Sequence, residues 1–192
     1  MKLFLILILT LSAYLSSQDY LDYPHPYHST ETTKGMVVSQ NYLSSDIGAE
    51  ILSKGGNAVD AAIAVGFSLT ATLPRAGNIG GGGFMLVYDK KTESIISFDF
   101  RSMSPKLATP DVYKVNGVHQ YELSEEGYKA IAVPGTVAGL IEAHEMFGTM
   151  DLADLVNPTI ELLKEGVPVT DDLYWAINDT ESLKNDRESK KI

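Results

Sequence analysis

Residues 77–101 read GNIGGGGFMLVYDKKTESIISFDFR, and this stretch decides the fold. Four consecutive glycines lead into an apolar run at residues 84–88. A short polar turn separates that run from a second one at residues 94–100. Two apolar runs that flank a short polar turn predict a β-hairpin. Arg101 stands where the second strand ends.

A helix is predicted immediately before the glycines, over residues 58–73. Asn57 is a favourable helix cap, and Asp60 lies in the first turn, near the positive end of the helix dipole. Nearly every residue of this helix is small or apolar. A helix that is apolar on all sides must be buried on nearly all of them. We therefore expect it to form a central layer.

The segments farther upstream predict one strand and one more helix. Met36-Val37-Val38 is typical of a short buried strand. Ser44 or Ser45 can cap a helix that runs to about Lys54. Gly55 and Gly56 then end that helix.

The segments downstream predict a strand at residues 130–133 and then helices. The turn before residues 137–147 contains Thr136, which we interpret as the cap of that helix. A further helix is predicted over residues 152–165, with a break at Pro158. Strands interleaved with helices indicate an α/β or α+β fold.

Composition excludes several classes of function. The chain has 192 residues, a formal net charge of −10 and no cysteine. Its lysines and arginines are scattered, which argues against nucleic-acid binding, because phosphate recognition needs a clustered basic face. The lack of cysteine excludes disulfides, thiolate metal sites and a cysteine nucleophile.

The N-terminus predicts export. Residues 1–17 combine a lysine, an apolar run at residues 3–11 and a small, polar exit, as in a secretory signal peptide. That run is too short to cross a bilayer, which needs about 20 apolar residues. We expect a periplasmic or extracellular protein with no membrane anchor after cleavage, and an extended leader at residues 18–34. His25 and His28 lack further ligands at suitable spacing, so we expect no metal site.

The four glycines at residues 80–83 allow two interpretations. Glycine is found where the backbone needs dihedral freedom or where another group approaches closely. The run is either a tight packing crossover or a loop that faces a ligand. A phosphate-binding loop is excluded, because no Lys-Ser or Lys-Thr follows and the next element is a strand.

Arg101 is the main candidate binding residue. Strand ends and their loops are where scaffolds present functional groups. A guanidinium offers a planar fork of donors that binds a carboxylate with two hydrogen bonds. The alternative is a structural ion pair with Asp99 or another acidic residue.

Taken together, five ordered motifs resemble the N-terminal part of the γ-glutamyltransferases, which are also called γ-glutamyl transpeptidases or glutathione hydrolases. The resemblance covers about residues 35–175, and its motifs are residues 35–39, 55–62, 77–85, 99–101 and 133–139. It implies an α+β fold, part of the four-layer αββα architecture of N-terminal nucleophile (Ntn) hydrolases, which is incomplete in this chain. Residues 35–192 would be the N-terminal portion of the large subunit.

The resemblance also implies a reaction that needs no cofactor. In the family the precursor cuts itself, and the threonine that begins the small subunit attacks the γ-amide of glutathione. The γ-glutamyl group then passes to water or to an amino acid or peptide. Arg101 matches the arginine that binds the α-carboxylate of the substrate. The nucleophilic threonine is expected beyond residue 192, so we expect the isolated chain to be inactive and to need the small subunit as a partner.

One departure from the family and three alternatives bear on this interpretation. The family has a glutamate after the arginine, where this chain has Ser102, so substrate affinity is expected to differ. The alternatives are a related Ntn acylase, an enzyme that acts on capsule poly-γ-glutamate, and a non-catalytic secreted remnant that acts as a binding module.

Overall fold

The computed structural model describes residues 31–191. Residues 35–191 belong to one compact unit. The predicted signal peptide at residues 1–17 and the leader up to residue 30 lie outside the described residues, and so do His25 and His28.

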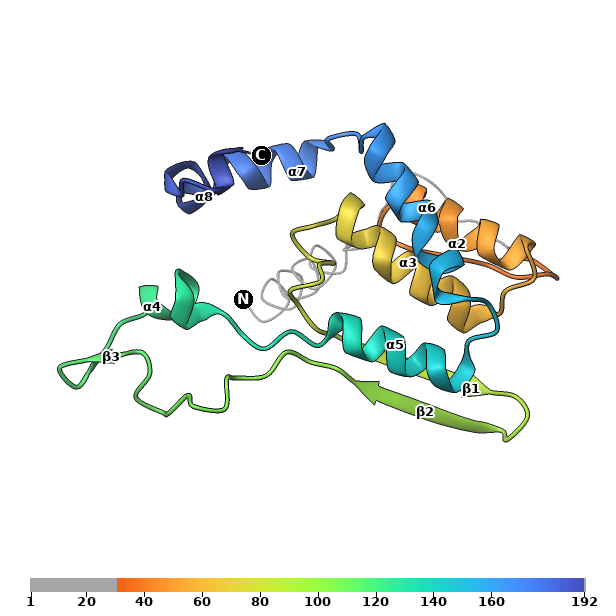
Figure 1. Ribbon diagram of the computed structural model, residues 1–192, viewed down its shortest axis with the longest axis horizontal. Coiled ribbons are helices and arrows are strands. Elements are labelled where there is room, and N and C mark those ends of the chain that lie inside the picture. The colour runs from red at the N-terminus through yellow and green to blue at the C-terminus, as the bar shows by residue number, and fades with distance from the viewer. Residues whose placement is uncertain (1–30, 192) are drawn as a thin grey trace, which may run out of the picture. The chain divides into compact units, whose positions relative to one another are not determined.

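Helices predominate over strands in the described unit (Figure 1). The strands are β1 (Phe84–Asp89), β2 (Ser94–Asp99), β3 (Lys114–Val115) and β4 (Val118–His119). The α-helices are α2 (Tyr42–Ser53), α3 (Ala58–Thr72), α4 (Glu122–Glu125), α5 (Thr136–Phe147), α6 (Leu152–Glu165), α7 (Asp171–Asn178) and α8 (Glu181–Asn185). Two single 3₁₀ turns, η1 (Tyr128–Ala130) and η2 (Ser189–Lys191), complete the order.

Helix α3 is the central helix, as predicted. Asn57 accepts hydrogen bonds from the N–H groups of Val59 and Asp60, and Asp60 accepts one from the N–H of Asn57, so that the two residues form a capping box. The helix contacts α2, α5 and α6. Most of its side chains are buried or half-buried, although Ala62 is exposed. The core that forms around it comprises Ile47, Ile51, Val59, Ala61, Ile63, Ala64, Phe98, Leu140, Ala143 and Leu155.

Helix α2 begins earlier than predicted, because its cap is Asn41. The Oδ1 atom of Asn41 accepts the N–H of Leu43 at 2.9 Å. Ser44 is instead fully buried one turn inside the helix, where its hydroxyl lies 2.8 Å from that of Thr72 in α3. The predicted cap at Ser44 or Ser45 is therefore wrong: an amide side chain already satisfies the helix terminus one turn upstream.

Strands β1 and β2 form the predicted antiparallel hairpin. Phe84 pairs with Asp99, and Asp89 with Ser94. Because side chains alternate along a strand, one face of the hairpin packs on the core through Met85, Val87, Ile96 and Phe98. The rings of Phe98 and Phe147 of α5 meet edge to face at 6.2 Å. Helix α5 lies alongside the hairpin in Figure 1 and covers this face.

Two predicted strands do not form. Residues 36–38 form no strand and lie in no sheet; Val37 packs against the core, whereas Val38 is 81% exposed. Residues 130–133 provide only one bridge, between Val133 and Met103. Apolar residues alone do not make a strand, because each segment also needs a partner to accept its main-chain hydrogen bonds.

Helix α6 runs through Pro158 without the predicted break, and its inward residues Leu155 and Thr159 are buried on both sides of the proline.

The β3–β4 hairpin was not predicted from the sequence. Its turn consists of Asn116 and Gly117, both with positive φ (51° and 79°), which is the usual signature of a two-residue hairpin turn.

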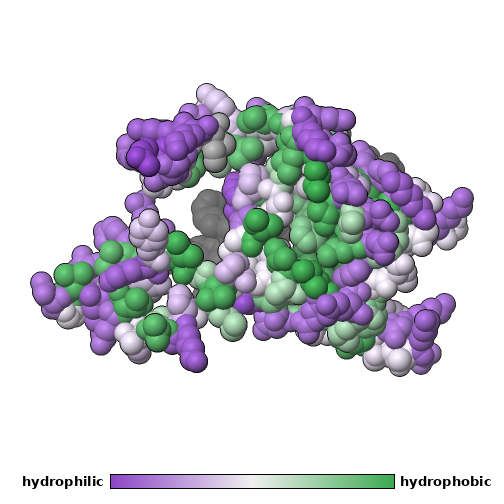
Figure 2. Space-filling model, viewed as in Figure 1, coloured by the Kyte–Doolittle hydropathy of each residue, from purple (hydrophilic) through white to green (hydrophobic). Residues whose placement is uncertain are grey.

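The surface mixes hydrophobic and polar regions (Figure 2). Large apolar side chains that are exposed include those of Leu86, Leu107, Ile131 and Leu163. None of the helices in the described part of the chain has both the length and the apolar character needed to span a bilayer.

Candidate functional site

Arg101 is held between two pairs of main-chain hydrogen bonds. On one side, Phe100 and Gly83 exchange N–H to carbonyl bonds of 3.1 and 3.3 Å, which extend the β1–β2 ladder by one residue. On the other side, Met103 and Val133 exchange bonds of 3.1 and 2.8 Å. The backbone at Arg101 therefore has little freedom, although it belongs to no strand.

The guanidinium of Arg101 is exposed and carries no ion pair to any residue between 31 and 191. Its one polar contact there is a long hydrogen bond of 3.5 Å from Nη1 to the hydroxyl of Ser102. Asp99 does not pair with the guanidinium; its Oδ1 accepts the main-chain N–H of Arg101 at 3.0 Å. The alternative of a structural ion pair with Asp99 is therefore wrong, and no other acidic residue between 31 and 191 pairs with this guanidinium.

The glycine run packs against the backbone that carries Arg101. A Cβ added to Gly82 would lie 2.5 Å from the carbonyl oxygen of Phe100 and 2.8 Å from the carbonyl carbon of Arg101. A Cβ on Gly83 would lie 2.9 Å from the ring of Phe100. The first two glycines of the run have only Asn78 close by. Of the two interpretations of the run, its second half supports the packing crossover.

Two glycines beyond the run, whose role was not predicted from the sequence, complete this packing. A side chain on Gly135 would clash with the carbonyl of Phe100, and one on Gly139 would clash with the ring of Phe100. Helix α5 therefore presents no side chain of its own at these two positions, which lets it pack directly on Phe100. The signal available in the sequence was the spacing of these two glycines, four residues apart, which places them on one helix face.

Thr136 does not cap α5 as predicted. The N-cap position is taken by Gly135, which has no side chain to offer. The hydroxyl of Thr136 instead donates to the carbonyl oxygen of Asn78 at 3.1 Å. Thr136 therefore links the start of α5 to the turn that begins the glycine run.

Asp60 is a buried structural carboxylate, in agreement with its predicted place in the first turn of α3. It accepts the N–H groups of Asn57 at 2.9 Å and Thr149 at 3.0 Å, and the hydroxyl of Thr149 at 2.5 Å. Burial raises its pKa, but the hydrogen bonds from Thr149, Asn57 and Met150 outweigh that effect and hold the pKa below its usual value. All these partners are structural, so Asp60 joins α3 to the segment after α5.

A cavity of about 650 Å³ lies within the segment that follows Arg101. It is lined by residues 104–105, 107–110, 112–113 and 128–132, among them Leu107, Tyr113 and Tyr128. The Met103–Val133 bridge joins the two ends of this segment. Across residues 31–191, no three histidine, aspartate or glutamate side chains come together as they would to hold a metal ion.

Comparison with known proteins identifies the lineage. The family described as Gamma-glutamyltranspeptidase matches residues 44–192. The chain belongs to the gamma-glutamyltranspeptidase family. Its relatives include the protein named Glutathione hydrolase proenzyme from Bacillus subtilis (strain 168), which is 44% identical over 147 residues. That match covers 76% of this chain and 25% of the relative.

Solved structures of the family share the fold. Helicobacter pylori gamma-glutamyltranspeptidase superposes with a TM-score of 0.81 at 37% identity, over 85% of this chain and 47% of that one. The gamma-glutamyltranspeptidase from Pseudomonas nitroreducens, solved in complex with L-DON, gives a TM-score of 0.76 at 42% identity, over 81% and 46% of the two chains. The α+β fold is thus that of the Ntn hydrolases. The chain spans about a quarter of the length of the curated relative that it matches.

Proposed function

We propose that the protein to which this chain belongs transfers γ-glutamyl groups from glutathione and other γ-glutamyl compounds to water, amino acids or peptides. Membership of the gamma-glutamyltranspeptidase family supports this reaction, as does similarity to a glutathione hydrolase proenzyme. The role of residues 31–191 in it is to bind the substrate and support the site.

The observation that carries the proposal is the state of Arg101. Its guanidinium is exposed, has no carboxylate partner among residues 31–191, and sits on a backbone held on both sides. A γ-glutamyl group carries a free α-carboxylate at the end opposite the amide that reacts. Two parallel N–H to oxygen bonds from Arg101 would hold that carboxylate and fix the orientation of the γ-amide.

The nucleophile in this proposal comes from the small subunit. Its N-terminal threonine hydroxyl attacks the γ-carbonyl carbon, and the threonine's own amine takes the proton. The amide C–N bond breaks, the amine product leaves with a proton, and a γ-glutamyl ester remains on the enzyme. Water or an amino acid then attacks this ester and releases the threonine. No residue of this chain matches that threonine, so the 192-residue polypeptide alone would not turn over substrate.

The small subunit would pack on the outer face of the β1–β2 hairpin. Phe84, Leu86, Tyr88 and Ile95 point away from the core there, and Leu86 is 71% exposed. In a four-layer αββα architecture a second sheet covers this face. Burial of apolar surface stabilises such an interface by about 25 cal/mol per Å². The name proenzyme, given to the B. subtilis relative, is consistent with subunits cut from one precursor.

Export is also proposed, on the composition of residues 1–17. The basic start, the short apolar run and the small, polar exit direct the protein across the inner membrane, to the periplasm or the exterior. Glutathione and γ-glutamyl peptides outside the cytoplasm would be the substrates. Mass measurement of the mature large subunit tests this: retention of residues 1–17 contradicts it.

The experiment compares Arg101→Lys and Arg101→Ala in the complete, self-processed enzyme, with γ-glutamyl-p-nitroanilide as substrate. Lysine keeps the charge but cannot form the two-pronged contact. Because a hydrogen bond to a charged group contributes about 1.5–3 kcal/mol, KM should rise roughly tenfold or more in both variants. Unchanged KM values would overturn the proposed role of Arg101.

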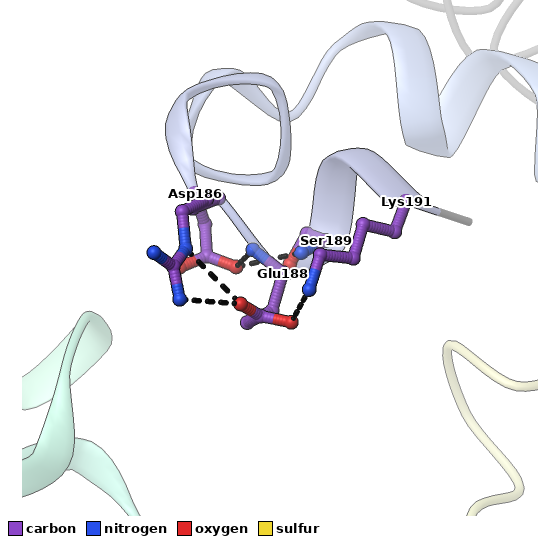
Figure 3. A network of polar contacts seen from close by, with 5 residues as sticks. Asp186, Glu188, Ser189 and Lys191 are labelled. Carbon is purple, nitrogen blue, oxygen red and sulfur yellow. Dashed lines mark hydrogen bonds and ion pairs between the residues drawn. The ribbon is translucent and has the colours of Figure 1, made fainter.

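A matched control is Arg187→Ala. The side chain of Arg187 is 91% exposed and pairs with its neighbour Glu188 at 3.1 Å. The surrounding network joins Asp186, Glu188, Ser189 and Lys191 within one short segment (Figure 3). Exposed pairs of this kind contribute little, about 0–1 kcal/mol. Arg187→Ala should therefore leave KM unchanged.

A further inference from the structure

The hydroxyl of Thr136 makes a hydrogen bond that the helix does not need. A threonine at the start of a helix usually satisfies one of the free N–H groups of the first turn. Thr136 instead donates to the carbonyl oxygen of Asn78, 58 positions earlier in the chain, at 3.1 Å. The bond is half-buried and crosses from the start of α5 to the turn before the glycine run.

Further main-chain bonds strengthen the same link. The carbonyl oxygen of Asn78 also accepts the N–H of Gly81 at 3.2 Å and so closes the turn at residues 78–81. The carbonyl of Gly81 in turn accepts the N–H groups of Gly135 at 2.8 Å and Thr136 at 3.2 Å. Thr136 thus donates to this turn twice, through its hydroxyl to Asn78 and through its main-chain N–H to Gly81.

The turn at residues 78–81 leads directly to the backbone of Arg101. The next glycine, Gly82, lies so close to residues 100–102 that no side chain fits between them. Gly135, which bonds to Gly81, also touches the carbonyl of Phe100. Close packing of this kind transmits displacement, because protein interiors have few voids in which a shift can be absorbed.

We propose that Thr136 is a positioning residue for Arg101. Its hydroxyl holds the 78–81 turn, the turn holds Gly82, and Gly82 holds the backbone from which the guanidinium projects. This inference rests on the proposed role of Arg101 in binding the α-carboxylate. Thr136 itself touches no substrate in this account.

The test replaces Thr136 by Val and by Ser in the complete, processed enzyme, with γ-glutamyl-p-nitroanilide as substrate. Valine keeps the shape and removes the hydroxyl, whereas serine keeps the hydroxyl. Thr136→Val should raise KM about three- to thirtyfold and leave kcat within about twofold. The contact between Arg101 and the α-carboxylate is the same in the bound substrate and in the transition state, so weakening it affects KM and not kcat. Thr136→Ser should retain the native KM. An unchanged KM in Thr136→Val would overturn the proposal.

A double variant separates positioning from a general structural role. In an Arg101→Ala background, Thr136→Val should change KM less than about twofold, because residues that act through one interaction are not additive. If Thr136→Val raises KM by about three- to thirtyfold in that background as well, the proposal is overturned, while the role of Arg101 stands. If Arg101→Ala alone does not change KM, the proposed role of Arg101 in substrate binding fails. This result differs from the one that overturns the positioning role of Thr136, so the experiment distinguishes the two.

Two more variants guard against failure to fold. Thr136→Ala removes the hydroxyl without adding bulk, so it can replace Thr136→Val if the latter is not processed. If neither folds while Thr136→Ser does, the hydroxyl supports the whole fold and the proposal is overturned. Thr180→Val is the matched control: its hydroxyl donates to the carbonyl of Ala176 at 2.6 Å, in the junction between α7 and α8. It should leave KM unchanged.

Discussion

The ring of Phe100 packs directly on Gly139 of helix α5, in the space that a Cβ at that position would occupy. The residue after Phe100 is Arg101, the proposed ligand of the substrate carboxylate. The hairpin, the glycine run and α5 therefore meet at one place, and small residues are required there from two separate parts of the sequence.

A matched pair of substitutions in the glycine run tests this packing. Gly82→Ala should destabilise the enzyme by about 1–3 kcal/mol and raise KM, because the new methyl group collides with main-chain atoms that cannot rotate away. Gly80→Ala should be tolerated, since its Cβ would meet only the side-chain oxygen of Asn78, at 3.3 Å. Urea unfolding and steady-state kinetics of both variants measure the difference. Equal effects would show that close approach at Gly82 is not the reason for glycine there.

The buried carboxylate of Asp60 predicts a pH dependence of stability. Asp60→Asn should lower the free energy of unfolding at pH 7 by about 1–3 kcal/mol, because the amide nitrogen would face N–H and O–H donors.

The folded-state pKa of Asp60 is lowered, so its contribution is complete above the unfolded value of about 3.9 and disappears as the pH falls through the folded value. The gap between wild type and Asp60→Asn should therefore narrow below about pH 4, as measured by unfolding at several pH values. If the difference in unfolding free energy between the two proteins stays constant down to pH 2, the ionised carboxylate of Asp60 is not the source of this stability.

Two buried threonines should respond oppositely to the same substitution. The hydroxyl of Thr159 is buried with no hydrogen-bond partner in the described part of the chain, so Thr159→Val should stabilise the protein by about 1 kcal/mol. The hydroxyl of Thr72 contacts that of Ser44 at 2.8 Å and donates to the carbonyl of Ser68 at 3.2 Å. Thr72→Val should therefore destabilise by about 1–2 kcal/mol. Thermal unfolding of both variants measures the change in stability relative to the wild type. If both substitutions stabilise the protein, or both destabilise it, the account is contradicted.

Much of the fold could be predicted from local patterns. The cap at Asn57, the first-turn position of Asp60, the all-apolar helix and the hairpin were confirmed, because each depends on residues that are neighbours in sequence. The predicted cap at Ser44 or Ser45 and the cap at Thr136 were wrong for a common reason. A hydroxyl near a helix start has several possible hydrogen-bond partners. The partner that it binds is set by residues far away in the sequence: Thr72 for Ser44, 28 positions away, and Asn78 for Thr136, 58 positions away.

The candidate site was predicted only in part. Arg101 could be proposed because it follows a strand and matches a family motif, and its role remains a prediction. Its support could not be predicted, since Gly135 and Gly139 meet Phe100 only after the chain has folded. The lack of an acidic partner for the guanidinium between residues 31 and 191 was equally hidden: Asp99, which the sequence offered as one alternative partner, instead accepts a main-chain N–H.

The most direct test of the central claim changes enzyme and substrate together. γ-Glutamyl-p-nitroanilide and its analogue without the α-carboxylate, 4-aminobutyryl-p-nitroanilide, are compared in the wild-type enzyme and in Arg101→Ala by kcat/KM. If Arg101 binds the α-carboxylate, the wild type should prefer the γ-glutamyl substrate by roughly a hundredfold or more, and Arg101→Ala should lose most of that preference. A preference that survives the loss of Arg101 would contradict the account.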